Sequence, residues 1–426
     1  NKAVSDTYMP GSVFKMCTAS MAIEENKVND NSTFTCTGSI TVSDKTMHCA
    51  NTAGHGTQNF LQALCNSCNP AFVQIGQLVG MNKFREYYQG FGFSEKTGID
   101  LPGEADDTFW AEGEMSDVDL AVASFGQNFS ITPIQMITAC AAVANGGYVL
   151  QPYVVSKITN VDGNVIKSVE KKVKRQIISN STSAKLNEML GYNTQTAGAS
   201  SGYVAGYKVA GKTGTSEKIG SKTESSFGED YIASFCGYAP ADDPQIAMLV
   251  FFDTPSGGSY YGSQVSSPVF INIMSEVLPY LQVKTSYTDD ELEFVDVAAG
   301  DYTGISVSDA KAAVDQDGFT CTVKGDGDTV ISQIPTVSSK VSTGGNIVLY
   351  TDSNSQKETV TVPNLVGYSA SEVNNVASAC GLNVSFSGAA SSDGVSSAQD
   401  VAAGTSVSPG TVVTVSFASS DSNVRD

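Results

Sequence analysis

The sequence predicts a mixed α/β (α+β) protein in which helices flank a central antiparallel sheet and two small αβ domains follow. Two observations support this fold class. Residues 1–281 alternate helical and strand patterns, with three strand patterns in close succession. Residues 295–352 and 359–418 repeat one pattern of a helix followed by alternating strands. A polar, acidic linker at 282–294 is expected between them.

The expected helices of the first domain follow apolar residues spaced three or four apart. The first comes after the chain break at Pro10-Gly11, with Met16, Ala19 and Ile23 on one face. Pro268 is expected to begin the last helix, through Leu281, because proline is tolerated in a first turn. The remaining helix patterns cover residues 60–64, 71–79 and 132–144, the last ending at Asn145-Gly146-Gly147.

The three expected strands cover residues 207–215, 231–238 and 246–252. The third is a continuous apolar run, which is typical of a buried central strand. The connection at 239–244 is rich in Pro and Asp, as turns are. The second and third strands are therefore expected to pair as an antiparallel hairpin.

Composition narrows the range of partners and locations. The 426 residues carry a net charge of −20, which repels phosphate backbones, so nucleic acid is not expected as a partner. No stretch approaches the roughly 20 apolar residues that span a bilayer. The chain opens on Asn1 and reaches its first motif within a dozen residues, so we expect a fragment whose N-terminal region is missing.

Nine cysteines, an odd number, are scattered along the chain. A disulfide between Cys36 and Cys49 could close a short polar loop. Zinc is the alternative, and free or locally paired thiols are favoured over it, so no metal and no cofactor are expected. The side chains that could hold zinc are Cys36, His48, Cys49, His55, Cys65 and Cys68.

Ser12-Val13-Phe14-Lys15 places a hydroxyl and an amine three residues apart on an expected helix. Positions i and i+3 share a helical face, so the two groups can touch. A serine hydroxyl becomes a good nucleophile when a neighbouring base takes its proton, and a buried lysine can act as that base. The pattern is weak by itself, since Ser168 to Lys171 and Ser308 to Lys311 match it too.

Two further motifs make the pattern specific. Ser67-Cys68-Asn69 is the only Ser-x-Asn in the sequence, and it supplies a hydroxyl that can relay a proton and an amide that can hold a lysine. Lys212-Thr213-Gly214-Thr215 lies on the first of the three strands. Gly214 removes side-chain bulk there, which would let a substrate backbone approach the strand edge. A second Lys-Thr-Gly, at 96–98, leads into a turn-like segment and is interpreted as structural.

In this order, Ser-x-x-Lys, Ser-x-Asn and Lys-Thr-Gly resemble the signature of the penicillin-recognising serine acyltransferases. The approach to Ser12 is similar to that of class B penicillin-binding proteins, and the two repeats resemble PASTA domains. The resemblance implies the penicillin-binding protein transpeptidase fold, related to serine β-lactamases, of the Gram-positive division or sporulation type. Asn128 departs from the family, which usually has Gly there. Other matching segments are Ser124-Phe125-Gly126-Gln127, Ala144-Asn145-Gly146-Gly147, His55-Gly56 and Tyr231 to Phe235.

The resemblance also implies a mechanism. Ser12 would attack the penultimate carbonyl of a muropeptide stem ending in D-Ala-D-Ala while Lys15 accepts its proton. Ser67 would relay a proton to the departing D-Ala, and Asn69 would orient Lys15 and the stem. Lys212, Thr213 and Thr215 would bind the terminal carboxylate and shape the electric field of the site, beside Gly214, where the substrate backbone would approach. The amides of Ser12 and Thr215 would form the oxyanion hole.

The implied partners are stem peptides, their lipid-linked precursor, β-lactams that acylate Ser12, and a glycosyltransferase or divisome protein. The implied location is the extracytoplasmic face of the cell membrane, through an N-terminal anchor absent from this chain. Two alternatives share the motifs: a hydrolase, either a D,D-carboxypeptidase or a β-lactamase, and a sensor that is acylated but never turns over. A redox-sensitive disulfide at Cys68 is a further hypothesis.

Overall fold

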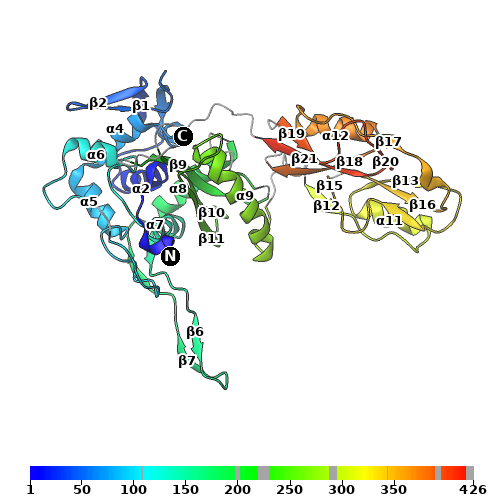
Figure 1. Ribbon diagram of the computed structural model, residues 1–426, viewed down its shortest axis with the longest axis horizontal. Coiled ribbons are helices and arrows are strands. Elements are labelled where there is room, and N and C mark those ends of the chain that lie inside the picture. Colours follow the sequence, from blue (N-terminus) through cyan, green and yellow to red (C-terminus); the bar gives the residue numbers. More distant parts are fainter. Residues whose placement is uncertain are drawn as a thin grey trace. The chain divides into compact units, whose positions relative to one another are not determined.

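The computed structural model describes residues 1–106, 109–196, 202–204, 206–218, 230–286, 295–342, 344–388 and 395–418. The chain forms two compact units, the first made of Asn1–Tyr203 and Lys208–Val283, the second of Val204–Tyr207 and Lys284–Ser422. Most of the expected linker, residues 287–294, lies outside the described residues. The mixed α/β class is confirmed, with a three-stranded antiparallel sheet in the first unit (Figure 1).

The first half of the first unit is mainly helical, with short strand pairs. Its elements are α1 (Lys2–Ser5), the 3-10 turn η1 (Gly11–Phe14), α2 (Lys15–Glu24), β1 (Thr33–Cys36), β2 (Ser39–Val42), β3 (Lys45–His48), β4 (Gly56–Asn59), α3 (Phe60–Cys65), α4 (Asn69–Val79), α5 (Met81–Gly90), α6 (Asp117–Ala123) and α7 (Pro133–Ala144). The second half contributes β5 (Tyr148–Leu150), β6 (Lys157–Thr159), β7 (Val165–Ser168), β8 (Val173–Gln176), α8 (Asn180–Thr196), β9 (Ala210–Glu217), β10 (Tyr231–Ala239), β11 (Ile246–Asp253) and α9 (Gly262–Tyr280).

The sheet has the order β11-β10-β9, and both pairings are antiparallel, so the predicted hairpin of β10 and β11 is confirmed. Successive side chains of β10 point to opposite faces. On one face Tyr238 donates a hydrogen bond to Asn187 of α8 at 2.5 Å. On the other, the ring of Phe235 lies 4.4 Å from that of Phe270 in α9. Helices therefore cover both faces of the sheet, as the sequence predicted.

Three details of the sequence prediction were wrong. The apolar run that forms β11 is half-buried and lies at one end of the described strand order, while β10 is the buried central strand. An apolar run shows that a strand is covered and not where it lies in the sheet. The strand expected to begin at Tyr207 begins at Ala210. The last helix begins at Gly262, so Pro268 lies inside it.

Helix α2 forms the centre of the first unit. The sequence predicted one apolar face, but every residue from Lys15 to Ala22 is buried. Helices α4, α5, α7 and α8 all contact it. Just before it, the ring of Phe14 packs edge-on against Phe129 at 4.9 Å and also contacts Phe84 and Phe93. This packing fixes the position of the turn that carries Ser12.

The second unit contains the two repeats, each with a two-stranded and a three-stranded sheet. The repeat at 295–352 holds β12 (Asp296–Ala298), α11 (Val307–Gln316), β13 (Thr320–Lys324), β14 (Ser332–Ile334), β15 (Lys340–Ser342) and β16 (Asn346–Tyr350). Before and within the repeat at 359–418 lie η3 (Ser355–Lys357), β17 (Val360–Thr361), α12 (Ala370–Ala379), β18 (Asn383–Gly388), β19 (Val395–Gln399), β20 (Ser406–Val407) and β21 (Val412–Ala418).

The repeated glutamine has the same role in both copies. The side-chain oxygen of Gln333 accepts a hydrogen bond from the Tyr302 amide, and its nitrogen donates to the carbonyls of Gly300 and Pro335. Gln399 likewise accepts from Leu365 and donates to two backbone carbonyls. A buried amide that satisfies several backbone groups fixes the loops around it. This explains why the glutamine recurs at matching positions.

Candidate active site

Ser12 lies on η1, one turn before α2 begins. Gly11 precedes it with a φ of +58°, and the amide of Gly11 donates to the carbonyl of Gly126 at 2.8 Å. A Cβ on Gly126 would meet the Gly11 carbonyl oxygen at 2.0 Å, so only glycine allows this approach. The loop between α6 and α7 therefore supports the turn that carries Ser12. The sequence placed Ser12 in a first α-helical turn, whereas it lies on the tighter 3-10 turn before it.

The amine of Lys15 connects the first two motifs. It lies 3.0 Å from the Ser12 hydroxyl, which confirms that the two side chains share one face. It also donates to the carbonyl and hydroxyl oxygens of Ser67 at 2.5 and 3.1 Å, and to the side-chain oxygen of Asn69 at 2.7 Å. Lys15 has no exposed surface. A buried amine with several oxygen partners is held in one position.

Ser67 and Asn69 lie where α4 begins. Ser67 has a φ of +49°, a left-handed conformation that is rare for a residue with a side chain and that this junction imposes. It directs both the carbonyl and the hydroxyl of Ser67 to Lys15. The side-chain nitrogen of Asn69 donates to the carbonyl of His48 at 3.1 Å. That bond turns the amide oxygen of Asn69 towards Lys15.

Strand β9 carries the third motif and packs against η1. A Cβ on Gly214 would lie 2.7 Å from the Ser234 hydroxyl and 2.9 Å from a methyl of Val13. The missing side chain of Gly214 therefore makes room for the turn that carries Ser12, and the expected approach of a substrate backbone to this strand edge remains a prediction. The hydroxyl of Ser216 donates to the carbonyl of Met9 at 2.7 Å, which ties β9 to the same segment.

The other side chains of the third motif lie on this strand. Lys212 is buried, and its amine contacts the carbonyl and hydroxyl oxygens of Thr213, both at 3.3 Å. The hydroxyl of Thr215 accepts a hydrogen bond from the Gly262 amide at 3.1 Å. Burial raises the pKa of the Cys65 thiol to about 11, and the positive charge of Lys212 opposes that rise. Lys212 therefore acts electrostatically on a residue only two positions before Ser67.

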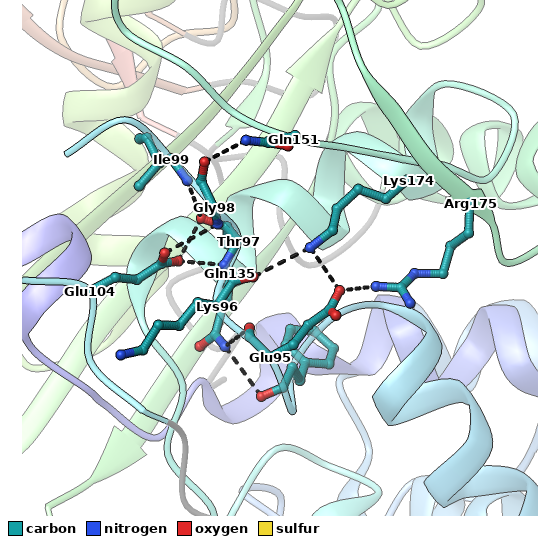
Figure 2. A network of polar contacts seen from close by, with 11 residues as sticks. Glu95, Lys96, Thr97, Gly98, Ile99, Glu104, Gln135, Gln151, Lys174 and Arg175 are labelled. Carbon is teal, nitrogen blue, oxygen red and sulfur yellow. Dashed lines mark hydrogen bonds and ion pairs between the residues drawn. The ribbon is translucent and has the colours of Figure 1, made fainter. Parts of the chain in front are cut away.

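The second Lys-Thr-Gly is a loop with structural partners (Figure 2). The carboxylate of Glu104 accepts hydrogen bonds from the amide and hydroxyl of Thr97 and from the amide of Gly98. Gln151 donates to the Gly98 carbonyl at 2.6 Å, and Lys174 donates to the Lys96 carbonyl at 3.3 Å. These residues form no strand. The interpretation of this copy as structural is confirmed.

Sequence reasoning missed two features around the site. The contact of Gly11 with Gly126 and the carbonyl of His48 involve backbone atoms, which leave little signal in side-chain motifs. Asn128, which departs from the family pattern, has a φ of +66°, a conformation that Asn tolerates better than most residues. The sequence named the thiols that meet at Cys68 among six candidate zinc ligands, but it did not show which of the six come together.

The sequence left a disulfide between Cys36 and Cys49 open as a possibility; in the structure the two are unbridged, and all nine cysteines are free thiols. Cys49 and Cys68 nonetheless lie close together. The hydrogen bond between them lowers the pKa of the Cys49 thiol well below its usual value and raises the pKa of Cys68. His55 lies 3.5 Å from the Cys49 sulfur.

This arrangement of a serine, a buried lysine, a Ser-x-Asn junction and a neighbouring strand defines a class of lysine-assisted serine acyltransferase sites. Comparison with known proteins agrees. The model of the penicillin-binding protein transpeptidase domain matches residues 1–275, and that of the PASTA domain matches 297–353 and 360–419. The chain belongs to the penicillin-binding protein transpeptidase family and carries two PASTA domains.

Individual relatives give the same result. Stage V sporulation protein D of Bacillus subtilis is 35% identical over 367 residues, covering 84% of this chain and 56% of the relative. Peptidoglycan D,D-transpeptidase FtsI of Escherichia coli K12 is 27% identical, covering 71% and 49%. The crystal structure of penicillin-binding protein 3 from Mycobacterium tuberculosis, complexed with aztreonam, superimposes with a TM-score of 0.61 at 26% identity, covering 67% and 65%.

The chain spans about half the length of the curated relatives that it matches. Within the described part of the chain, the helices are too short or too polar to cross a bilayer. The domain limits predicted from the sequence, 1–281, 295–352 and 359–418, remain a prediction, and the matched segments lie within a few residues of them.

Proposed function

We propose that this chain is the acyl-transfer unit of a peptidoglycan D,D-transpeptidase. The observation that carries the proposal is the Lys15 amine, which contacts the hydroxyls of Ser12 and Ser67 and the amide of Asn69. A single buried amine between two hydroxyls can take a proton from one and return it through the other. Similarity to peptidoglycan D,D-transpeptidase FtsI supplies the substrate class.

In the first half-reaction, Ser12 attacks the penultimate carbonyl of a D-Ala-D-Ala stem, and its proton passes to Lys15. The amides of Ser12 and Thr215 stabilise the oxyanion, and one such donor typically contributes on the order of 10²–10³ in rate. The peptide bond then breaks, and the proton passes through Ser67 to the departing D-Ala. The second stem's amine attacks the acyl-Ser12 ester and loses a proton to Lys15. The bond from the carbonyl carbon to the Ser12 oxygen then breaks, and Lys15 returns the proton to that oxygen.

Lys212, Thr213, Gly214 and Thr215 form the second wall of this site. A buried cation on β9 attracts the terminal carboxylate of the stem. The packing of η1 on β9 brings this strand against the turn that carries Ser12. A β-lactam imitates the D-Ala-D-Ala terminus, opens on Ser12 and remains as an ester. The aztreonam complex of penicillin-binding protein 3 supports the β-lactam proposal.

We also propose that the substrate arrives as a lipid-linked precursor and that a glycosyltransferase or divisome protein supplies the glycan strand. The reaction would then take place on the outer face of the cytoplasmic membrane, where peptidoglycan is assembled. The PASTA domains and the similarity to a sporulation protein and to FtsI support this setting.

Labelling with fluorescent penicillin tests the proposal. Wild-type protein is expected to form a stable covalent adduct, and Ser12→Ala is expected to form none. Ser5→Ala is the matched control, because Ser5 is exposed and lies only seven residues away. Labelling that survives Ser12→Ala would overturn the assignment. Rapid release of penicilloate, or labelling without cross-linking of a D-Ala-D-Ala donor to an amine acceptor, would replace the transpeptidase with the hydrolase or the sensor.

A further inference from the structure

Three thiols and one imidazole meet beside the Ser-x-Asn motif. The sulfurs of Cys36, Cys49 and Cys68 and a ring nitrogen of His55 all lie within 4.8 Å of one another. The three thiols are buried and His55 is half-buried. The sequence named six candidate ligands but favoured unliganded thiols. Folding brings four of the six together, which reopens the zinc interpretation.

The backbone places each of the four residues where an element begins or ends. Cys36 is the last residue of β1, Cys49 follows β3, His55 precedes β4 and Cys68 precedes α4. Strands β1 and β4 pair so that Cys36 lies opposite Gly56, which brings His55 next to Cys36. The hairpin of β2 and β3 returns the chain to the same point, and the Cys49 amide donates to the Gly38 carbonyl at 2.9 Å.

Two glycines allow these segments to approach one another closely. A Cβ on Gly38 would meet the Thr52 carbonyl oxygen at 2.1 Å, and a Cβ on Gly54 would meet the Cys36 carbonyl oxygen at 2.5 Å. Both have a positive φ, at +95° and +84°. The loops that hold Cys36, Cys49 and His55 are therefore locked together by backbone contacts, so the cluster is built into the fold.

We propose that Cys36, Cys49, His55 and Cys68 bind one Zn²⁺ in a structural site. Three thiolates and one imidazole form a closed tetrahedral set that zinc prefers. Ordinary zinc–ligand lengths place two sulfurs about 3.8 Å apart and a sulfur and a nitrogen about 3.6 Å apart. The Cys49 sulfur lies 3.5 Å from Nδ1 of His55, close to the second value. A disulfide would use only two of the three thiols and would give His55 no role.

The site has a consequence for catalysis, which rests on the proposed function. Cys68 is the middle residue of Ser67-Cys68-Asn69, so a metal on its sulfur fixes the backbone of both neighbours. The adjoining ligand Cys49 follows His48, whose carbonyl accepts the hydrogen bond from Asn69. The metal therefore holds Ser67 and Asn69 against Lys15 from two directions. Because all four coordination positions are filled by protein, zinc would position these groups without touching the substrate.

Metal analysis of the purified chain tests the site without any activity measurement. Wild-type protein from zinc-supplemented cells is expected to carry one zinc per chain, and its Co²⁺ form is expected to show tetrahedral thiolate spectra. Cys36→Ser, Cys49→Ser and His55→Gln are expected to lose most of the zinc. His48→Gln and Cys65→Ser are the matched controls, because neither side chain belongs to the cluster. His55→Cys restores four ligands and is expected to keep zinc, which separates loss of a ligand from misfolding.

The proposal is overturned if metal-replete wild-type protein holds no zinc, or if His55→Gln and Cys49→Ser keep it. For the catalytic consequence, zinc is removed under reducing conditions and then restored. The rate of penicillin acylation is expected to fall by about 10- to 100-fold when zinc is removed, and to recover when zinc is restored. This is the usual size of the effect when the groups that support a metal site are lost. If wild-type protein carries one zinc but its acylation rate stays the same when the zinc is removed, the zinc site stands and only its proposed effect on catalysis is refuted. Full zinc with no acylation at all would refute the proposed function and leave the metal site standing.

Discussion

The side-chain nitrogen of Asn69 donates a hydrogen bond to the backbone carbonyl of His48 at 3.1 Å, and this bond sets the direction of the whole amide. With the nitrogen so engaged, the oxygen faces Lys15 at 2.7 Å. A segment 21 residues earlier in the chain thereby determines how the second motif meets the first. The site depends on this cross-connection as much as on the motif residues.

Removing the Asn69 amide tests that connection. Asn69→Ala is expected to slow acylation by about 10- to 100-fold, because Lys15 loses one oxygen partner and the His48 carbonyl loses its donor. Stopped-flow acylation with a chromogenic β-lactam measures the effect. Asn66→Ala is a nearby control, since that side-chain amide donates to the side-chain oxygen of Gln58 at 2.9 Å. Equal rates in both variants would contradict the positioning role.

Replacing Lys15 tests the proposed base. Lys15→Met keeps roughly the same volume but cannot accept a proton, so acylation of Ser12 is expected to fall by about 10²- to 10⁴-fold. Lys171→Met is the control, because Lys171 stands in the unrelated Ser-x-x-Lys pattern at 168–171 and is exposed. Circular dichroism establishes that both variants fold. Acylation near the wild-type rate in folded Lys15→Met would rule out Lys15 as the base.

Alanine substitutions at two glycines with nearly the same backbone conformation distinguish the effect of a steric clash from that of backbone strain. Gly126 and Gly163 have φ values of +84° and +82°. A Cβ on Gly126 would meet the Gly11 carbonyl oxygen at 2.0 Å, whereas a Cβ on Gly163, in the connection between β6 and β7, would meet nothing within 4 Å. Figure 1 labels these two strands. Both alanine variants share a left-handed strain of about 1 kcal/mol.

Gly126→Ala is therefore expected to lose a further 1–3 kcal/mol, on the order of an overpacked core, and to slow acylation by displacing the turn of Ser12. Gly163→Ala is expected to keep wild-type acylation. Chemical denaturation gives the difference in unfolding free energy, and penicillin labelling gives the rate. Comparable losses in the two variants would show that backbone strain alone is responsible.

Asp296 is expected to make the stability of the two repeats depend on pH. Burial raises its pKa to about 6 from 3.8, although hydrogen bonds from the Phe386 amide and the charge of Lys340 oppose the rise. Because the folded pKa is the higher one, this carboxyl contributes stability that is fully present below about pH 4 and is lost as pH rises through about 6. The contact joins the two repeats, because Phe386 lies in the second.

Asp296→Asn is expected to remove that dependence. The unfolding free energy of Asp296→Asn minus that of wild type is expected to rise between pH 4 and pH 7, by up to about 3 kcal/mol. Calorimetry of the full chain at several pH values measures the transition of the second unit. Asp309→Asn is the control, because Asp309 lies on exposed helix surface. A constant difference between Asp296→Asn and wild type across this range would contradict the buried carboxyl.

The sequence by itself determined the chemistry and the order of the parts. Ser12 and Lys15 are three residues apart, so any helical turn brings them together, and the structure places them 3.0 Å apart. Local patterns likewise predicted the β10–β11 hairpin and the two repeats, because turn residues and repeated letters act over short distances. These features depend on neighbours in the chain.

Only the tertiary structure decided what distant segments do to one another. Apolar content could not show that β10 is the central strand and β11 the outer one among the described strands. Gly214 and Gly126 were needed for the approach of the Ser12 turn, which is a property of the packed backbone. Cys36, Cys49, His55 and Cys68 are spread over 33 positions and meet only because short strand pairs return the chain to one point. Spacing along the chain determines which near neighbours can touch, whereas contacts between distant segments depend on how whole helices and strands pack.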